Sequence, residues 1–129
     1  MELLVKIAWG LLALIHAAPA AVLVSPGTLA RLYGAEPGGD VGVLLTHRGA
    51  LFLALVVLCL YALFDPAVRR AAGLAVGISV VAFLVVYARA GFPPGPLRTI
   101  AIADLLALLP LAVALLSAWG DRTVRSSLP

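Results

Sequence analysis

The chain has little of the chemistry on which soluble enzymes and metalloproteins depend. It contains a single cysteine, Cys59, which excludes a disulfide within the chain and a metal cluster held by several thiolates. Charged residues make up 12% of its 129 positions, against about 25% in an average soluble domain. The sequence contains no phosphate-binding glycine loop, no G-x-S-x-G and no H-E-x-x-H motif. None of these soluble catalytic sites is therefore expected.

What the chain has in abundance is apolar sequence, with 64% of its residues hydrophobic. A soluble protein of this length could not bury so many apolar side chains, because small domains have a high ratio of surface to volume. The net charge is +3, but the basic residues are scattered and no surface of aromatic and basic residues accompanies them. Nucleic acid is therefore not an expected partner. The composition predicts that the chain's natural solvent is the lipid bilayer.

Four apolar runs are each close to the ~20 residues that a helix needs to cross the hydrocarbon core. They cover roughly residues 3–24, 43–64, 71–90 and 97–119. The segments between them, SPGTLARLYGAEPGGD, DPAVRR and GFPPGP, carry charges or the proline and glycine of turns. The first of these segments is expected to hold a short interfacial helix over Thr28–Tyr33. Short connections favour antiparallel neighbours, so we predict an all-α, polytopic membrane protein, an antiparallel four-helix transmembrane bundle, as one domain over residues 1–129.

The distribution of lysine and arginine predicts the orientation of the spans. One side collects Lys6, Arg69, Arg70, Arg122 and Arg125, and the other collects Arg31, Arg48, Arg89 and Arg98. The positive-inside rule then favours cytoplasmic positions for both termini. An alternative is that Ala18–Ala20, an A-x-A-like pattern, marks a signal-peptide cleavage site, which would leave three spans and an exported N-terminus.

Two features inside the spans have packing interpretations. Gly73 and Gly77 form a G-x-x-x-G step that lets helix backbones approach closely. We expect this step to pack within the bundle, with a homodimer face as the alternative. Cys59 lies in an apolar run and is expected to fill the core, since a free cysteine is commonly buried.

The polar residues of the spans are expected to gather in one leaflet. If the four spans alternate in direction, the outer half of the first span and the adjoining ends of the other three lie at the same side of the membrane. Charged groups at this depth usually face the bundle interior and find partners, and Asp104 with Arg48 or Arg98 is the expected ion pair. The candidate site consists of His16, His47, Arg48, Tyr87, Arg89, Arg98 and Asp104.

This polar group has several interpretations. In the first interpretation it is a hydrogen-bonded network that fixes the helices in register. In the second it is a pocket for a small lipidic or quinone-like molecule. The apolar body of that molecule would lie among the helices, and its polar head at the histidine, arginine and aspartate side chains. His16 or His47 with Asp104 could also perform proton chemistry in a small intramembrane enzyme. Axial haem ligation by the two histidines is not expected, because they lie at different depths and no metal-binding spacing accompanies them. No cofactor and no metal site is predicted.

Five segments together resemble a group of short bacterial four-span membrane proteins that are loosely DoxX-like. These segments are LIHAAPA, RLYGAEP, LLTHRGALF, VGIS and LRTIAIADLLALLP, and the resemblance covers nearly the whole chain. It implies a location in the bacterial inner membrane. Some members of the group carry the name phosphopantetheine adenylyltransferase. The residues do not support that activity here, since HRGA at His47–Ala50 lacks the second histidine of an H-x-G-H motif and opens a membrane span.

The sequence therefore predicts a binding or accessory membrane protein rather than an enzyme. The lipid bilayer and a lipidic small molecule are the expected partners, and a homodimer or a larger membrane complex is an open alternative. A small intramembrane enzyme and a purely structural subunit remain the competing functions.

Overall fold

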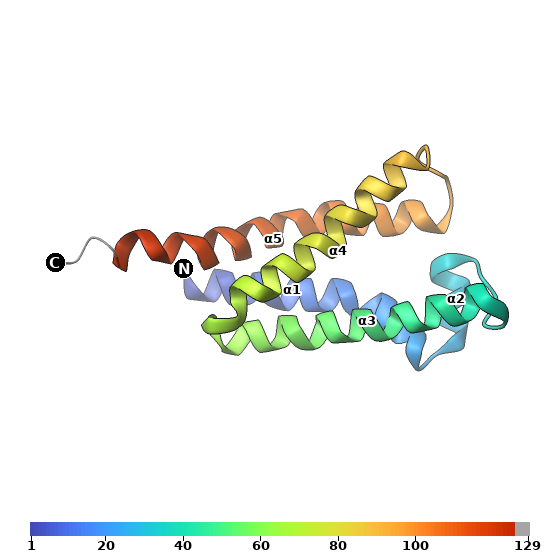
Figure 1. Cartoon of the computed structure of the whole chain (residues 1–129), viewed down its shortest axis with the longest axis horizontal. Helices are drawn as coiled ribbons and strands as arrows, with labels where there is room; N and C mark the ends of the chain where they lie inside the picture. Colours follow the sequence, from blue (N-terminus) through green and yellow to red (C-terminus); the bar gives the residue numbers. More distant parts are fainter. Residues whose placement is uncertain (126–129) are drawn as a thin grey trace.

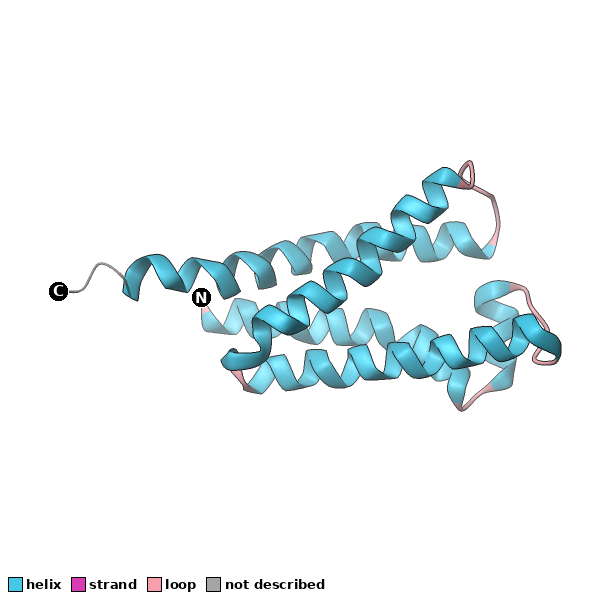
Figure 2. Cartoon of the chain, in the orientation of Figure 1, coloured by secondary structure: helices cyan, strands magenta, loops and turns pink. Residues whose placement is uncertain are grey.

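Helices make up nearly all of the computed structural model, which describes residues 1–125, with side chains as far as Gly120. Figure 2 shows helices joined by short loops, without a strand in this part of the chain. The elements are α1 (Glu2–Ala20), the 3₁₀ turn η1 (Ala21–Leu23), α2 (Pro26–Tyr33), α3 (Gly39–Phe64), the 3₁₀ turn η2 (Pro66–Val68), α4 (Arg69–Arg89) and α5 (Pro96–Arg125). The prediction of an all-α helical bundle is confirmed, and so is the short helix before the second span.

The four long helices run alternately up and down the bundle (Figure 1). The N-terminus, the turn between α3 and α4 and the last turns of α5 lie at one end, and α2 lies at the other end with the loop between α4 and α5. Helix α1 packs along α3 and along α5, and α4 packs mainly on α5. The side chains of Arg122 and Arg125, which contributed to the predicted orientation, lie outside the described residues.

Each long helix is long and apolar enough to cross a membrane. The candidate spans are Glu2–Leu23, Gly39–Phe64, Pro66–Arg89 and Pro96–Gly120. Large apolar side chains cover the outer surface of the bundle; Leu14, for example, is 69% exposed and Leu109 72%. A soluble monomer rarely exposes so much contiguous apolar surface, whereas lipid tails solvate it. The architecture is that of a multi-pass membrane protein.

Turn chemistry sets where the helices begin and end. Pro26 and Pro96 occupy the first positions of α2 and α5, where the missing N–H of proline costs no helical hydrogen bond. Gly34 ends α2 in the left-handed conformation, with φ of 63°, which glycine adopts without strain. Asp65 ends α3, and its carboxylate accepts a hydrogen bond of 2.8 Å from the Ala67 amide. The expected breaks are therefore where the chain reverses.

Small residues bring the helices close together in the core. A Cβ on Gly73 would lie 2.7 Å from Cδ2 of Leu115, and one on Gly77 would lie 3.9 Å from Cδ2 of Leu111. The G-x-x-x-G step thus faces α5 inside the bundle, as the packing interpretation expected. Cys59 is fully buried in the same core, beside the fully buried Trp9 and Leu12.

Candidate functional site

The side chain of Arg48 lies among three aromatic rings at the α2 end of the bundle. Its guanidinium carbon is 5.1 Å from the centre of the Phe52 ring, 5.6 Å from that of Phe83 and 5.8 Å from that of Tyr33. The rings belong to α3, α4 and α2, respectively. A guanidinium within about 6 Å of an aromatic face is attracted by the ring quadrupole. We call Arg48 and these three aromatic residues the Arg48 cage.

Arg48 lies well inside α3, away from both ends of the helix. It lies nine residues after Gly39, where α3 begins, which is ~13 Å along the helix axis at ~1.5 Å per residue. Phe52 follows one turn later, so the two side chains share a face of α3 and meet at the i, i+4 spacing. Arg48 is half-buried there. The positive charge of Arg48 therefore lies within the segment that is long and apolar enough to span a membrane, and not at the end of the helix.

Asp104 lies in the first third of α5 and is half-buried. Burial raises the pKa of Tyr33 above its ordinary value of 10.0, while the Arg48 guanidinium lowers it and the Asp104 carboxylate raises it. Asp104 forms no ion pair with the side chains described as far as Gly120. The expected salt bridge from Asp104 to Arg48 or Arg98 is thus not formed among the described side chains.

His16 of α1 lies behind the cage and is almost completely buried. Its ring centre is 5.7 Å from that of Phe52. Its Nδ1 lies 2.8 Å from the Leu12 carbonyl oxygen. A carbonyl only accepts, so Nδ1 carries the proton and donates it. In the neutral imidazole this leaves Nε2 as an acceptor, and none of the residues up to Gly120 donates a hydrogen bond to it.

Tyr87 extends the aromatic contacts of the cage toward the loop between α4 and α5. Its ring stacks on Phe83 at 6.1 Å and meets Phe92 edge-on at 5.8 Å. The Tyr87 hydroxyl donates a hydrogen bond of 3.0 Å to the Pro93 carbonyl oxygen. That hydroxyl therefore holds the loop, and the ring supports Phe83 from behind.

The other three predicted site residues lie at the same end of the bundle but outside the cage. His47, Arg89 and Arg98 are exposed. They form no hydrogen bond or ion pair with other side chains in the part of the chain that the structure describes. The structure thus brings together His16, Arg48 and Tyr87 through the rings of Phe52 and Phe83. It leaves His47, Arg89 and Arg98 at the surface, and Asp104 forms no ion pair or hydrogen bond with these side chains among the described residues.

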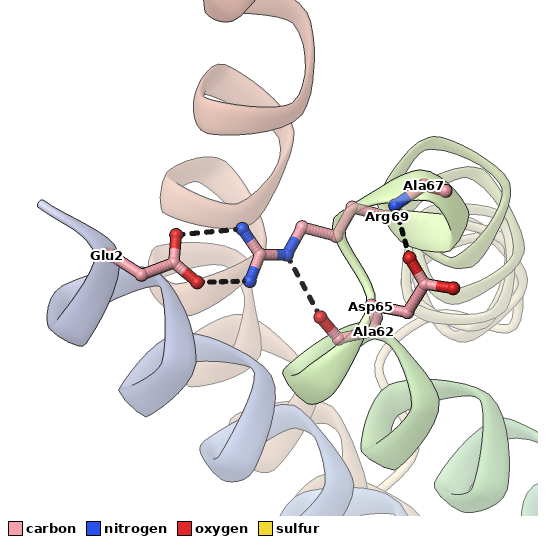
Figure 3. A network of polar contacts seen from close by, with 5 residues as sticks. All are labelled: Glu2, Ala62, Asp65, Ala67 and Arg69. Atoms are coloured by element: carbon pink, nitrogen blue, oxygen red, sulfur yellow. Dashed lines mark hydrogen bonds and ion pairs between the residues drawn. The ribbon is translucent and has the colours of Figure 1, made fainter.

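A second polar network closes the opposite end of the bundle (Figure 3). The buried Arg69 donates two hydrogen bonds to the Glu2 carboxylate, at 2.6 and 3.0 Å, and its Nε donates one of 2.9 Å to the Ala62 carbonyl oxygen. Arg70 donates from Nε to the Ala118 carbonyl oxygen at 2.8 Å. These bonds connect α1, the end of α3, the start of α4 and the end of α5.

Sequence reasoning missed the aromatic members of the site and the network at Arg69. The signal for part of the cage was present, since Phe52 follows Arg48 by four residues and Tyr87 follows Phe83 by four. Tyr33 lay in the interfacial helix that the sequence did predict. Arg69 was taken as a topological charge at a helix end, and nothing in its sequence neighbourhood indicated the bond to Glu2.

Comparison of the chain with protein-family models, curated proteins and solved structures finds no significant match. The resemblance to DoxX-like proteins therefore stays a prediction. Among the described residues, no group of three or more histidine, cysteine, aspartate or glutamate side chains could hold a metal ion. The function has to be argued from the Arg48 cage and the two side chains beside it.

Proposed function

We propose that this multi-pass membrane protein binds an amphipathic small molecule, a lipid or a quinone-like compound, with its polar head at the Arg48 cage. The apolar part of that molecule would lie along the lipid-facing sides of the helices. The protein would act as a binding or accessory protein of the bacterial inner membrane. With both termini in the cytoplasm, the cage would open toward the outer leaflet.

The observation that supports this proposal most strongly is that the Arg48 guanidinium lacks hydrogen bonds to the described residues. Three rings attract its charge, but the guanidinium forms no hydrogen bond with any residue up to Gly120. A guanidinium carries five N–H donors, and unsatisfied donors at membrane depth are costly. A ligand head with acceptor oxygens would satisfy these donors without disturbing the rings.

The arrangement also has the composition of a ligand site in a helical bundle. Such sites are mostly apolar, with a few polar groups that converge from different helices. Here α1, α2, α3 and α4 contribute His16, Tyr33, Arg48 and Phe83, respectively. A site built from four helices depends on the whole fold and on no single loop.

The proposal is tested by the lipids and quinones that remain bound after purification in mild detergent. Native mass spectrometry of the wild type is expected to show a bound amphiphile that Arg48→Gln loses. Arg98→Gln is the matched control, because Arg98 is an exposed arginine at the same end of the bundle. This control is expected to retain the amphiphile as the wild type does.

The competing structural interpretation makes a different prediction in the same experiment. If the cage only fixes the helices in register, the wild type and Arg98→Gln carry no specific amphiphile, and Arg48→Gln lowers the thermal stability of the helical fold. A bound amphiphile retained equally by wild type and Arg48→Gln would place the binding site elsewhere and overturn the proposal.

A further inference from the structure

Two contacts with α5 hold the side chain of Arg70 at the end of the bundle that contains the N-terminus. Its Nε donates a hydrogen bond of 2.8 Å to the Ala118 carbonyl oxygen, and its guanidinium carbon lies 5.9 Å from the centre of the Trp119 ring. That ring also lies against Gly73 of α4, because its Cζ3 atom is 3.9 Å from the position of a Cβ on the glycine. The guanidinium is therefore fixed between α4 and α5.

These contacts leave the two terminal nitrogens of Arg70 without a partner among the residues that the structure describes. A guanidinium has five N–H donors, and the bond from Nε uses one of them. The other four belong to Nη1 and Nη2, which form a planar fork that matches two oxygens of one carboxylate or phosphate. The Trp119 ring attracts the positive charge but supplies no such oxygens. Arg70 thus presents an oriented fork for an anion.

The neighbouring Arg69 shows the same fork in its occupied form (Figure 3). Its Nε donates to the Ala62 carbonyl oxygen at 2.9 Å, as that of Arg70 does to Ala118. Its Nη1 and Nη2 donate to the two oxygens of the Glu2 carboxylate at 3.0 and 2.6 Å. Both arginines are therefore anchored by a helix carbonyl, and only Arg69 has its anion within the described part of the chain.

The depth of Arg70 indicates where its anion comes from. Arg70 lies four residues after Pro66, where the third candidate span begins, and Trp119 lies one residue before Gly120, where the fourth ends. At ~1.5 Å per residue, both are within ~6 Å of the ends of their spans. Lipid head groups lie at this depth, and tryptophan is enriched there.

The charges at this end favour a lipid with a net negative charge. In the sequence, five basic residues belong to this end, namely Lys6, Arg69, Arg70, Arg122 and Arg125. The acidic residues there are the three carboxylates of Glu2, Asp65 and Asp121. Basic residues beside a membrane surface attract anionic lipids, whereas a zwitterionic head would add an ammonium group to this excess of positive charge.

We propose that Arg70 and Trp119 form a binding site for the phosphate of an anionic phospholipid such as phosphatidylglycerol. The Nη fork of Arg70 holds two phosphate oxygens, and the Trp119 ring keeps the guanidinium in place. One turn deeper in the bundle, Leu74 and Leu116 are 56% and 75% exposed and accommodate the acyl chains. This site lies at the opposite end of the bundle from the Arg48 cage, so it goes beyond the proposed function.

The test is competition between phosphatidylglycerol and phosphatidylethanolamine in nanodiscs that contain equal amounts of the two. The lipids retained on extraction into mild detergent are counted by native mass spectrometry. The wild type is expected to retain phosphatidylglycerol over phosphatidylethanolamine by about fivefold, the ratio that one arginine gains beside an anionic lipid. Arg70→Gln is expected to abolish this preference. The matched control is Lys6→Gln, which removes an exposed positive charge at the same end and is expected to keep it.

Further variants separate the fork from the charge and from the fold. Arg70→Lys keeps the charge without the fork and is expected to fall between the wild type and Arg70→Gln. Trp119→Leu removes the ring beside the guanidinium and is expected to weaken the preference, whereas Trp119→Phe retains a ring and is expected to keep it. These variants provide the test if Arg70→Gln fails to fold. An excess of inorganic phosphate is expected to leave the phosphatidylglycerol bound.

Three outcomes would overturn this inference. Equal retention of the two lipids by the wild type would mean that no anionic lipid is selected. An equal loss of preference in Arg70→Gln and Lys6→Gln would mean that the attraction is spread over the surface and that Arg70 forms no site. Release of phosphatidylglycerol by inorganic phosphate would assign the fork to a soluble anion. The proposed function depends on Arg48 variants and is unaffected by each of these outcomes.

Discussion

Two arginines at opposite ends of the bundle satisfy their guanidinium groups in different ways. Arg69 has the Glu2 carboxylate and the Ala62 carbonyl oxygen as acceptors at 2.6–3.0 Å. Arg48 has aromatic rings around it, without a hydrogen bond to the described residues. The guanidinium of Arg69 has its acceptors within the protein, and that of Arg48 does not. For this reason we assign a structural role to Arg69 and a binding role to Arg48.

Replacing Arg69 by methionine tests the structural role. The bond from Arg69 to Ala62 is buried, and a hydrogen bond of this charged kind contributes about 1.5–3 kcal/mol to stability. Arg69→Met is expected to destabilise the folded protein by that amount, measured from the midpoint of unfolding in denaturing detergent. Lys6→Met is the control, because Lys6 is an exposed cation on α1. Equal midpoints for the two variants would remove the structural role of Arg69.

Tyr33 reports on the charges of the Arg48 cage through its pKa. Burial raises this pKa above the ordinary 10.0, Arg48 lowers it and Asp104 raises it, with a net increase. The folded protein therefore holds the phenolic proton more tightly than the unfolded chain. This contributes stability that is present below about pH 10 and is lost as the pH rises through the folded-state pKa.

The titration is followed by tyrosinate absorbance, with the curve of Tyr33→Phe subtracted to isolate Tyr33. Tyr33 is expected to ionise above pH 10.0, and Asp104→Asn is expected to lower its midpoint because a negative charge beside the phenol is removed. A midpoint at or below the ordinary value, or one that Asp104→Asn leaves unchanged, would show that the carboxylate does not act on this hydroxyl.

The members of the site could be predicted only in part, for a physical reason. The antiparallel order of the spans predicts that His16, Arg48 and Asp104 lie toward one end of the bundle. It did not say which face of each helix points inward, because the spans are apolar around their whole circumference and carry no amphipathic signal. The rotation of the helices decides that Phe52 and Phe83 meet Arg48 while His47 and Arg98 stay exposed.

At the scale of the element, the beginning of α3 differs from the predicted start of the second span. The apolar run predicts a span from about residue 43, but the helix begins at Gly39. Its first turn carries Asp40, whose negative charge is favourable near a helix N-terminus. Polar residues thus extend the helix by a turn that hydrophobicity alone does not reveal. This extra turn places Arg48 deeper in the helix than its position in the apolar run suggests.

Gly42 allows the backbone of the preceding loop to pack closely against the first turn of α3. A Cβ at this position would lie 2.6 Å from the Glu36 carbonyl oxygen and 2.6 Å from the Pro37 carbonyl carbon. Backbone atoms cannot move aside as a flexible side chain would, so Gly42→Ala is expected to displace the preceding loop and to destabilise the fold by about 1–3 kcal/mol.

The matched control is Gly10→Ala, because no heavy atom lies within 4 Å of a Cβ on Gly10. Alanine in a helix interior is favoured over glycine by roughly 0.5–1 kcal/mol, so this variant is expected to unfold at an equal or higher denaturant concentration than the wild type. A Gly42→Ala variant as stable as Gly10→Ala would mean that the loop does not pack against α3 in this way.

At the scale of the whole molecule, the two ends of the bundle differ in the side-chain contacts that they contain. The end with the termini is closed by the bonds of Arg69 and Arg70, and α4 and α5 meet there through the contact of Gly73 with Leu115. The other end is covered by the short helix α2, whose Leu29 is fully buried. One end therefore holds the helices together, and the other presents the Arg48 cage.

The orientation of these ends in the membrane can be measured by cysteine labelling. With Cys59 replaced by alanine, Glu36→Cys and Ala67→Cys place single exposed thiols at opposite ends of the bundle. If both termini are cytoplasmic, a membrane-impermeant maleimide added to intact cells is expected to label the first thiol and not the second. Labelling of the thiol at position 67 alone would reverse the orientation and put the cage in the cytoplasmic leaflet, with the same members.

The central claim is that the Arg48 guanidinium is completed by a bound head group, and a crystal structure grown from a lipidic mesophase tests it most directly. The account predicts density for a head group within hydrogen-bond distance of the Arg48 N–H groups, surrounded by Tyr33, Phe52 and Phe83. A direct ion pair between Arg48 and Asp104, with no ligand density between the rings, would contradict it.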